Sequence, residues 1–337
     1  MPFLKPSQQM LDQRSGLVQQ LRQWMSVHAI ERHHPIIIGM SGGLDSTVLS
    51  EAMHRLGQVI EIAHVNYGLR GDESDGDESF VREWASQRSI QVHVLRAGEA
   101  EVKGTGNQAW ARSIRYPWFE TLRSAAAAAH ASPAFIATAH HAEDQAETVL
   151  LNLIRSTDPH ALAGMEEISR NNTLIRPILS IRRADLENQA QQWNLSYRTD
   201  SSNAKPDYTR NRIRHELIPL MESIRSGTTE HLSRWAVRFQ PWTEIKKATI
   251  DEALAKCTTS LDCGQVTLDL KLWRTHPLRL EILHALAAMF HISARAVPEI
   301  ERLTEPAVES NAKFVSSHAE VIREKHTLNW SSLNPTS

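Results

Sequence analysis

The fold of this chain is decided by residues 36–47, which read IIIGMSGGLDST. The β-branched run predicts a buried strand, the glycines predict a tight turn, and residues 48–53 predict the start of a helix. Such a junction presents free backbone N–H groups and the positive end of a helix dipole to an anion. Ser41 and Ser46 add hydroxyl donors, and Asp45 adds a carboxylate suited to a magnesium ion bound to phosphate. The stretch therefore predicts a phosphate site.

The loop differs in sequence from two other phosphate-binding loops. It lacks the Gly-Lys-Ser/Thr ending of the Walker loop and the spaced glycines of a dinucleotide fingerprint. Its pattern resembles instead the PP-loop of the ATP pyrophosphatases, enzymes that adenylate an oxygen and release pyrophosphate. The alternative is a glycine pair that only a tight turn requires. The candidate ATP-binding residues of the loop are Ser41, Gly42, Gly43, Leu44, Asp45 and Ser46.

Length and composition exclude several classes of protein. The 337 residues are enough for two domains, and 41% hydrophobic and 23% charged residues are typical of a soluble protein. No apolar run approaches the roughly 20 residues that cross a bilayer, and residues 1–6 contain no signal-peptide core. The only cysteines, Cys257 and Cys263, are separated by five residues, which is not the spacing of a C-x-x-C site. We therefore expect a cytoplasmic protein that does not bind a membrane.

Charge is distributed unevenly along the chain. The net charge is −2, but residues 170–247 contain 14 Lys and Arg against eight Asp and Glu, a local balance of +6. The remainder therefore carries −8. A basic segment in an otherwise acidic protein is a candidate contact for a polyanion, and the alternative is an ordinary solvated helical surface.

Short apolar runs alternate with helical stretches in the first part of the chain. This alternation predicts parallel βαβ units in a doubly wound, mostly parallel α/β sheet. Ligands of such sheets bind beyond the carboxyl ends of the strands. The phosphate loop, residues 64–66 and residues 140–141 all follow or end predicted strands, so we expect them to form one site.

The second part of the chain has a different pattern. We expect an α/β catalytic domain over residues 1–218 and a smaller, mainly helical accessory domain over residues 219–337. A short strand-like tail over residues 313–330 belongs to the second domain.

Residues 140–148, which read HHAEDQAET, carry a second group of polar side chains. Asp144 and Glu147 are three residues apart and therefore share one face of a helix. Acidic residues in a first turn are also favoured by the helix dipole, which is the alternative explanation. As a functional pair, these carboxylates would bind a cation, either magnesium or an amine.

Several motifs in order resemble the tRNA(Ile)-lysidine synthetase family. The resemblance extends over roughly residues 36–220 and rests on the PP-loop, residues 64–70, 108–116, 140–148, 162–165, 176–179, 200–203 and 208–217. Three positions depart from the family pattern: Tyr67 replaces a usual His, Gln108 a frequent Glu, and Glu143 the first Asp of a pair. These departures leave open what Tyr67, Gln108 and Glu143 contribute.

The resemblance implies a reaction on RNA. ATP adenylates the carbon-2 oxygen of the wobble cytidine in the CAU anticodon of isoleucine tRNA, and free L-lysine then displaces AMP through its ε-amine. The PP-loop, with His64 and Asn66, would bind ATP, and Asp45 would hold Mg²⁺. Asp144 and Glu147 would bind lysine. The implied catalytic residues are Asp45, Arg112, Asp144 and Glu147, and the implied tRNA contacts are Arg115, Arg210, Arg212 and Arg214.

Other interpretations stay open at this stage. The chain could be a different PP-loop enzyme that modifies tRNA, although a sulfur-inserting enzyme usually needs a closely spaced pair of cysteines. It could also be a non-catalytic RNA-binding relative. The sequence leaves open the oligomeric state (a homodimer is one option), the general base, the tRNA identity elements and the detailed role of the second domain.

Overall fold

The computed structural model describes residues 16–69, 71–97, 107–156, 159–169, 171–198, 208–261 and 264–333. The chain forms two compact units, Met1–Gln240 and Pro241–Ser337. The division falls inside helix α10 (Thr228–Cys257), later than the expected boundary after residue 218. The first part of α10 belongs with the first unit, where the Gln240 side-chain amide donates to the Met165 carbonyl oxygen at 3.0 Å. Helix α6 (Ala142–Arg155) lies in the same unit.

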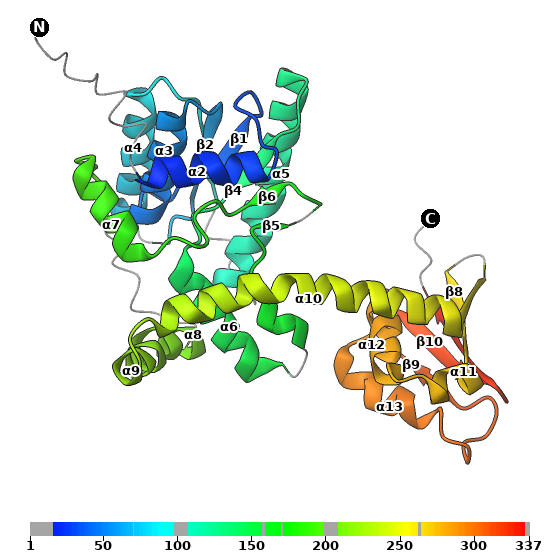
Figure 1. The fold of residues 1–337 in the computed structure, drawn as a ribbon. Coiled ribbons are helices and arrows are strands. Elements are labelled where there is room, and N and C mark those ends of the chain that lie inside the picture. The colour runs from blue at the N-terminus through cyan, green and yellow to red at the C-terminus, as the bar shows by residue number, and fades with distance from the viewer. Residues whose placement is uncertain are drawn as a thin grey trace, which may run out of the picture. The chain divides into compact units, whose positions relative to one another are not determined.

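The first unit is built on a six-stranded sheet, which confirms the predicted α/β fold (Figure 1). Its strand order is β3-β2-β1-β4-β6-β5, and every neighbouring pair is parallel except β5 with β6. The strands are β1 (Ile36–Gly39), β2 (Ile60–Asn66), β3 (Val92–Arg96), β4 (Phe135–Ala137), β5 (Ile168–Ser169) and β6 (Leu174–Ile175).

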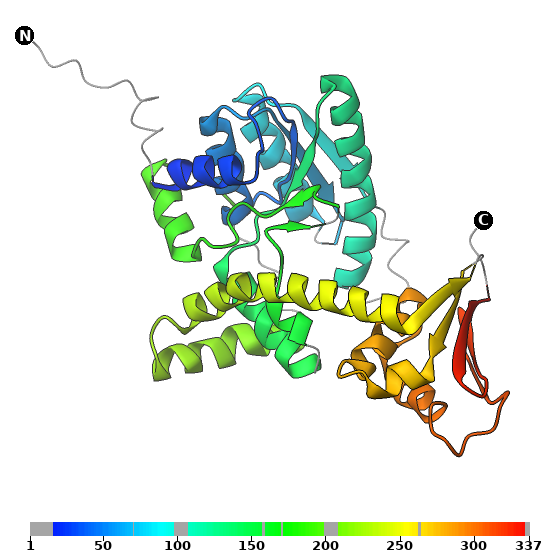
Figure 2. The same ribbon diagram turned by 45° about the vertical axis from the view of Figure 1, so that its right-hand side comes forward.

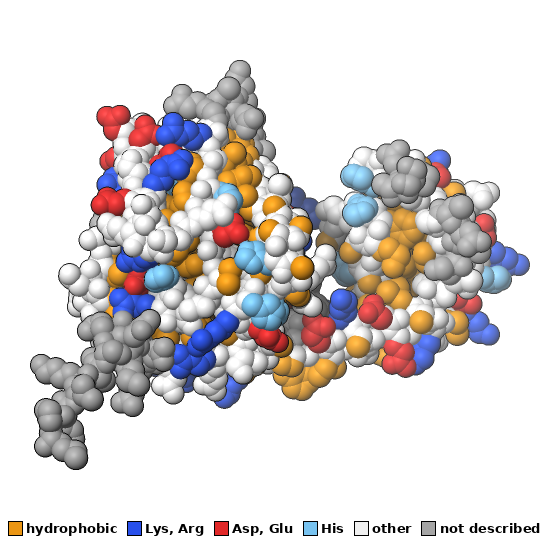
Figure 3. Space-filling model, turned by 90° about the horizontal axis from the view of Figure 1, so that it is seen from above, with side chains coloured by type: hydrophobic (Ala, Val, Ile, Leu, Met, Phe, Trp, Pro, Cys, Tyr) orange, Lys and Arg blue, Asp and Glu red, His pale blue; other side chains and the backbone are white. Residues whose placement is uncertain are grey.

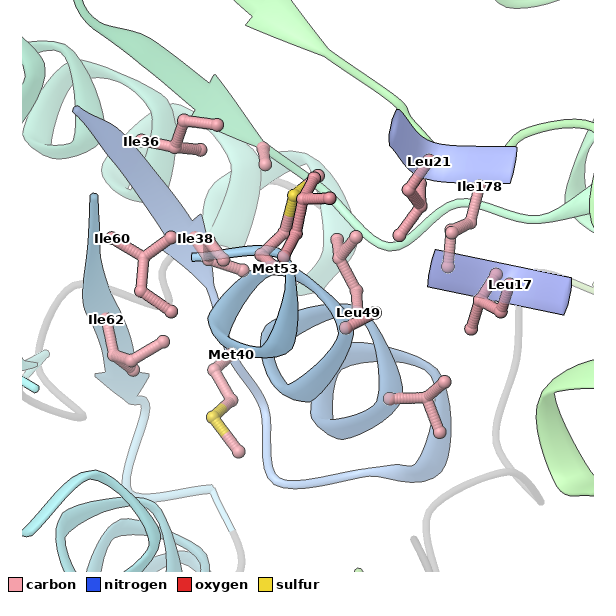
Figure 4. Close-up of a cluster of buried hydrophobic side chains, with 14 of the residues drawn as sticks. Leu17, Leu21, Ile36, Ile38, Met40, Leu49, Met53, Ile60, Ile62 and Ile178 are labelled. Atoms are coloured by element: carbon pink, nitrogen blue, oxygen red, sulfur yellow. The ribbon is translucent and has the colours of Figure 1, made fainter. Parts of the chain in front are cut away.

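Helices cover both faces of this sheet (Figures 1 and 2). Their bounds are α2 (Gly16–Val27), α3 (Leu44–Leu56), α4 (Asp72–Ser86), α5 (Asn107–His130), α6 and α7 (Arg183–Gln192), with the 3₁₀ turn η2 (Pro159–Ala163). Alternation along β1 explains the two layers, because Ile36 and Ile38 pack with α2, α3, α4 and α7, whereas Ile37 packs with α5. Figure 4 shows the first of these cores, in which Ile36 and Ile38 lie beside Met53 and Leu49 of α3.

The remaining helices of the first unit follow residue 207. They are α8 (Tyr208–Arg212), the π-helical turn η4 (Ile213–Leu217), α9 (Ile218–Ile224) and the first part of α10. Because β1, β2 and β4 are parallel, the loops at their carboxyl ends meet at one edge of the sheet, which is where the polar motifs were expected.

The second unit contains a five-stranded antiparallel sheet with strand order β7-β8-β11-β10-β9. The expected strand-like tail is present as β9 to β11, while β7 and β8 had not been expected. Helices complete its core. The elements are β7 (Thr258–Leu261), β8 (Gln265–Asp269), α11 (Leu270–Thr275), α12 (Arg279–Met289), η5 (Ala294–Ala296), α13 (Val297–Arg302), β9 (Lys313–Val315), β10 (Ala319–Arg323) and β11 (Thr327–Ser332).

No helix within the described ranges is both long and apolar enough to cross a membrane. On the face drawn in Figure 3, Lys and Arg side chains are interspersed with Asp and Glu side chains and with exposed hydrophobic ones.

Candidate functional site

The hydroxyl groups of Ser41 and Ser46 form hydrogen bonds within the loop that follows β1. Ser41 Oγ lies 3.1 Å from Ser46 Oγ, and the Ser41 N–H donates to Ser46 Oγ at 3.2 Å. Ser46 Oγ in turn donates to the Gly43 carbonyl at 3.1 Å. Gly42 has φ +91°, a left-handed conformation that a side chain would strain. The loop therefore keeps its shape without using all its N–H groups.

The amino end of α3 supplies further donors. Gly43 is its N-cap and provides no side-chain cap, so the N–H groups of the first turn are not satisfied by the cap. These groups and the helix dipole favour an anion at this position. The predicted strand–loop–helix junction is thus present, and its helix begins without a side-chain cap.

A cavity of about 230 Å³ opens beside the loop. Loop residues line one part of it, and both apolar and polar side chains from β2, α5 and the segments that follow β2 and β4 line the rest. Its lining residues are Gly39, Met40, Ser41, Gly43, Asp45, Ser46, Ala63, Val65, Tyr67, Arg115, Phe119, Thr138, Ala139 and His140. Polar groups of the loop together with apolar and aromatic side chains suit a ligand with a phosphate end and a ring.

Asp45 faces this cavity with unused hydrogen-bonding capacity. Its Oδ1 is buried, and no donor among the described residues reaches it. Its Oδ2 lies 3.8 Å from His141 Nε2 and 3.7 Å from Arg183 Nη1. Burial raises the pKa of Asp45, and the positive charges of His141 and Arg183 only partly oppose this. The carboxylate is therefore poorly compensated and suited to a cation.

His64 and Asn66 do not line the cavity. Along β2, Ala63, Val65 and the following Tyr67 face the cavity, so strand alternation turns His64 and Asn66 to the opposite face. His64 Nδ1 lies 2.9 Å from the Met40 carbonyl oxygen, and burial lowers the pKa of this imidazole.

Asn66 is engaged in a structural network. Its Nδ2 donates to Asp75 Oδ1 at 2.9 Å and to Glu78 Oε2 at 3.1 Å, and its Oδ1 accepts from the Gly68 N–H. These contacts tie the end of β2 to α4. The assignment of Asn66 to ATP is untested and finds no support in this geometry.

The two arginines of α5 differ in position. Arg115 lines the cavity and its Nε is buried with no partner among the described residues, whereas Arg112 is exposed. Both guanidinium groups lie over the Tyr116 ring, at 5.3 Å for Arg112 and 5.1 Å for Arg115. Arg115, expected on tRNA, is thus the arginine nearer the phosphate loop.

His141, which was expected at this edge of the sheet but was assigned no role, connects the loop to the acidic pair. It is the N-cap of α6, and its N–H donates to Asp144 Oδ2 at 3.1 Å. Its Nε2 is 3.4 Å from Asp144 Oδ2 and 3.8 Å from Asp45 Oδ2. Burial opposes protonation, but the hydrogen bond to Glu143 and the charges of Asp144 and Asp45 raise the pKa of His141 overall.

His140 has a different environment from its neighbour. It lines the cavity, and its Nδ1 lies 2.9 Å from Thr138 Oγ1. Burial is the main reason that its pKa is lowered to about 4. The pKa values of the adjacent histidines are therefore shifted in opposite directions. The sequence shows the two histidines as neighbours at the end of a predicted strand, but only the fold shows that their environments differ.

Asp144 and Glu147 lie together at the start of α6, as predicted, and both are already paired. Glu147 is 1% exposed, and Arg210 Nε and Arg214 Nε donate to it at 2.8 and 2.5 Å. Arg214 Nη2 and Arg210 Nη2 lie 3.4 and 3.7 Å from Asp144 Oδ1. Burial opposes ionisation of Asp144, but nearby His141, His140 and Arg210 lower its pKa overall.

The three arginines expected on tRNA are therefore split between two surroundings. Arg210 and Arg214, four residues apart, share the face directed at the acidic pair, whereas Arg212 pairs with Glu216 at 2.9 Å in an exposed position. Gln108 has a side chain outside the described part of the structure, as do residues 200–203 of the family motif.

Comparison with known proteins agrees with this geometry. The family described as PP-loop domain matches residues 14–221. A tRNA(Ile)-lysidine synthase of Bacteroides thetaiotaomicron is 35% identical, over 69% of this chain and 55% of the relative. The enzyme of that name from Rhodopirellula baltica is 32% identical, over 70% of this chain and 69% of the relative.

A solved structure shares the fold. The U34-tRNA thiolase of Methanococcus maripaludis matches with a TM-score of 0.54 and 18% identity, over 66% of this chain and 78% of that one. The chain spans little more than half the length of the Bacteroides relative. Since the PP-loop match covers most of the chain and about two thirds of the Rhodopirellula relative is matched at 32% identity, this chain belongs to the tRNA(Ile)-lysidine synthase family of PP-loop proteins.

Proposed function

We propose that this protein ligates free L-lysine to carbon 2 of the wobble cytidine in the CAU anticodon of isoleucine tRNA, at the expense of ATP. In the first step, the cytidine O2 attacks the α-phosphorus of ATP and pyrophosphate leaves. In the second, the lysine ε-nitrogen attacks carbon 2, loses a proton, and AMP leaves with the former O2.

The observation that carries the proposal is that Asp45 and Asp144 both approach the same nitrogen of the His141 imidazole. His141 Nε2 is 3.8 Å from the first and 3.4 Å from the second. A phosphate loop and a carboxylate pair for an amine thus lie at adjacent positions of one sheet edge. A reaction that joins an adenylated oxygen to an amine needs both sites within reach of one carbon atom.

Asp45 fits the expected magnesium site. Magnesium in nucleotide-binding sites usually takes one or two carboxylates and completes its shell with phosphate oxygens and water. Asp45 lines the cavity and its buried Oδ1 has no hydrogen-bond partner among the described residues, where no cluster of three acidic, His or Cys ligands occurs. Bound there with ATP, the ion would offset the negative charge of the departing pyrophosphate.

Asp144 and Glu147 would bind and orient lysine. Their present partners are guanidinium groups, so an incoming ammonium group would share or replace a cation rather than enter an empty acidic pocket. The ε-amine must lose its proton before it attacks, and a carboxylate beside it is a reasonable acceptor.

Arg115 would contact the adenylate phosphate or the flipped-out base, because it lines the cavity and carries an unsatisfied Nε. Arg112 is exposed beside it and would serve the RNA. An unpaired anticodon loop presents bases that such a pocket can hold. We place Arg212, an exposed arginine of the basic segment, on the tRNA backbone and the reaction in the cytoplasm, with a homodimer as the assembly to test.

The deciding experiment combines the protein with ATP, Mg²⁺, lysine and an isoleucine tRNA transcript carrying the CAU anticodon. Mass spectrometry of the digested nucleosides should reveal lysidine, and one pyrophosphate should be released per modified cytidine. A methionine tRNA with the same anticodon is the control and should remain unmodified. Pyrophosphate release without lysine incorporation would indicate another acceptor, and absence of release would indicate a binding protein.

A further inference from the structure

We propose that Arg198 is a positioning residue of the phosphate loop, acting through a clamp formed with Asp77 and Gly76 of α4. Arg198 lies far from the loop in sequence, on the segment that follows α7. The proposal rests on the proposed function only in taking ATP as the ligand of the loop.

The first contact of the clamp is made by the backbone. The Arg198 N–H donates to the Gly42 carbonyl oxygen at 2.9 Å. The same oxygen accepts from Thr47 Oγ1 at 3.3 Å. Gly42 carries the left-handed φ of +91° that turns the loop, so these two donors fix the peptide on which the direction of the loop depends.

The side chain makes the second contact. Arg198 Nε donates to Asp77 Oδ1, whose side chain is 14% exposed. The guanidinium group also lies against Gly76, where an added Cβ would be 2.9 Å from Nη2 and 3.2 Å from Cζ. Glycine within a helix costs about 1 kcal/mol of stability relative to alanine. The guanidinium group that lies against Gly76 explains why glycine occupies this position.

The loop itself closes the clamp. A Cβ on Gly42 would meet Phe80 Cδ1 at 3.3 Å, Val81 Cγ2 at 3.7 Å and the Asp77 carbonyl oxygen at 3.8 Å. The bend of the loop therefore packs directly on α4, the helix to which Arg198 is hydrogen-bonded through Asp77. The loop, helix α4 and the segment that carries Arg198 therefore each contact the other two.

The segment that carries Arg198 is anchored at its other end. Leu195 packs on the main core, and its N–H donates to the Ala190 carbonyl at 2.9 Å. Trp193 lies 4.6 Å under the Arg55 guanidinium. With both ends held, the Arg198 N–H has a fixed position from which to orient the Gly42 peptide.

The consequence is a loop that is shaped before ATP arrives. Phosphate-binding N–H groups contribute most when they need no rearrangement on binding. Arg198→Ala leaves the backbone donor but removes the guanidinium clamp. Gly76→Ala retains the guanidinium group but displaces it from α4. The two variants therefore disrupt the same contact, one by changing Arg198 and the other by changing Gly76.

The test uses the full chain in four forms: Arg198→Ala, Gly76→Ala, the double variant, and Arg182→Ala. Arg182 is the matched control, because it is also exposed and also paired with an Asp carboxylate, at 2.9 Å to Asp185. Hydrogen exchange of the peptide spanning residues 40–47 is measured without nucleotide, together with equilibrium binding of ATP and the KM and kcat for ATP.

We expect each single variant to exchange about tenfold faster in the 40–47 peptide and to bind ATP about tenfold more weakly, which corresponds to about 1.4 kcal/mol. The kcat at saturating ATP should change little, and Arg198→Lys should recover only part of the loss since an ammonium cannot lie flat on Gly76. The double variant should be no worse than Arg198→Ala.

Unchanged loop exchange in both single variants, or losses that add in the double variant, would overturn the clamp. If the variants show faster loop exchange but the wild-type protein does not bind ATP, the clamp stands as a structural feature and the proposed function is refuted. The two failures are therefore distinguishable.

Discussion

The phosphate loop and the acidic pair lie side by side but are satisfied to very different degrees. Asp45 has a buried oxygen without a donor among the described residues, and the first turn of α3 has no side-chain cap. Asp144 and Glu147 instead receive two guanidinium groups, and Glu147 is almost completely buried. The phosphate loop thus has hydrogen-bonding groups without partners among the described residues, whereas the two carboxylates of the acidic pair are already paired with arginines.

The difference shows how two kinds of ligand are accommodated. An anion with its metal can add to the loop without breaking a protein contact. A cation that approaches the acidic pair must compete with Arg210 and Arg214, so binding of the amine is coupled to movement or sharing of these arginines. We therefore expect substitutions in the loop to affect activity most and substitutions in the acidic pair to affect stability as well.

The largest effect should follow Asp45→Asn. The amide keeps the shape but removes the charge that would hold Mg²⁺ beside the departing pyrophosphate, so we expect kcat for pyrophosphate release to fall about 10³-fold. Asp185→Asn is the control, since this exposed carboxylate pairs with Arg182 outside the site. A loss of less than tenfold in Asp45→Asn would remove Asp45 from the metal role.

The second prediction compares stability across the two halves. Glu147→Gln leaves Arg210 and Arg214 without their carboxylate, and we expect a loss of about 3 kcal/mol in the free energy of unfolding at pH 7. Asp45→Asn should instead stabilise the fold, because burial raises the pKa of Asp45 and so disfavours its charged form.

Urea unfolding at pH 7 measures both changes with one protein preparation. Changes of the same sign in the two variants would contradict the contrast between an uncompensated and a compensated carboxylate. The difference in sign matters more than either magnitude, because only the local balance of charges predicts it.

Much of this contrast was predictable from local sequence, because local chemistry determines it. The residues 36–47 specify strand, turn and helix by their own periodicity, and the structure confirms the parallel sheet around them. The i, i+3 spacing of Asp144 and Glu147 likewise places both on one helix face. Neither inference needs information about distant residues.

The parts that could not be predicted depend on long-range contacts or on strand parity. His64 and Asn66 sit at the expected strand end but on the face away from the cavity, and only the register of Ala63 and Val65 reveals this. The pairing of Arg210 and Arg214 with α6 joins segments more than 60 residues apart. Their i, i+4 spacing was the available signal that they share a face, but nothing local identified the partner.

A third prediction concerns Glu78, which accepts a hydrogen bond from Asn66 in the network that ties β2 to α4. The Arg96 hydrogen bond is the main reason that the pKa of Glu78 is lowered to about 2. A carboxyl whose folded pKa lies below its unfolded value of 4.5 stabilises the protein above pH 4.5, and this contribution is lost as pH falls toward 2.

We expect Glu78→Gln to cost about 2 kcal/mol at pH 7, less than the full pKa shift implies because water screens the exposed Arg96 and Arg82. Unfolding free energies of both proteins, measured from pH 7 down to pH 3.5, should converge only below pH 4.5. A constant difference across this range would show that packing rather than charge holds Glu78. ATP binding by Glu78→Gln then tests whether the network supports the loop at all.

The smallest effect should come from the hydroxyl of Tyr67, which lines the cavity. It donates to the Ala111 carbonyl at 3.3 Å, a long hydrogen bond, so Tyr67→Phe should cost about 0.5 kcal/mol of stability and raise the KM for ATP less than twofold. Tyr67→Ala removes the ring that packs 5.6 Å from Trp110 and should raise the KM about tenfold. Tyr197→Phe, at an exposed tyrosine, is the control. Equal effects of the Phe and Ala variants would mean that Tyr67 acts through its hydroxyl; the expected inequality would mean that Tyr67 contributes the shape of its ring rather than a polar contact.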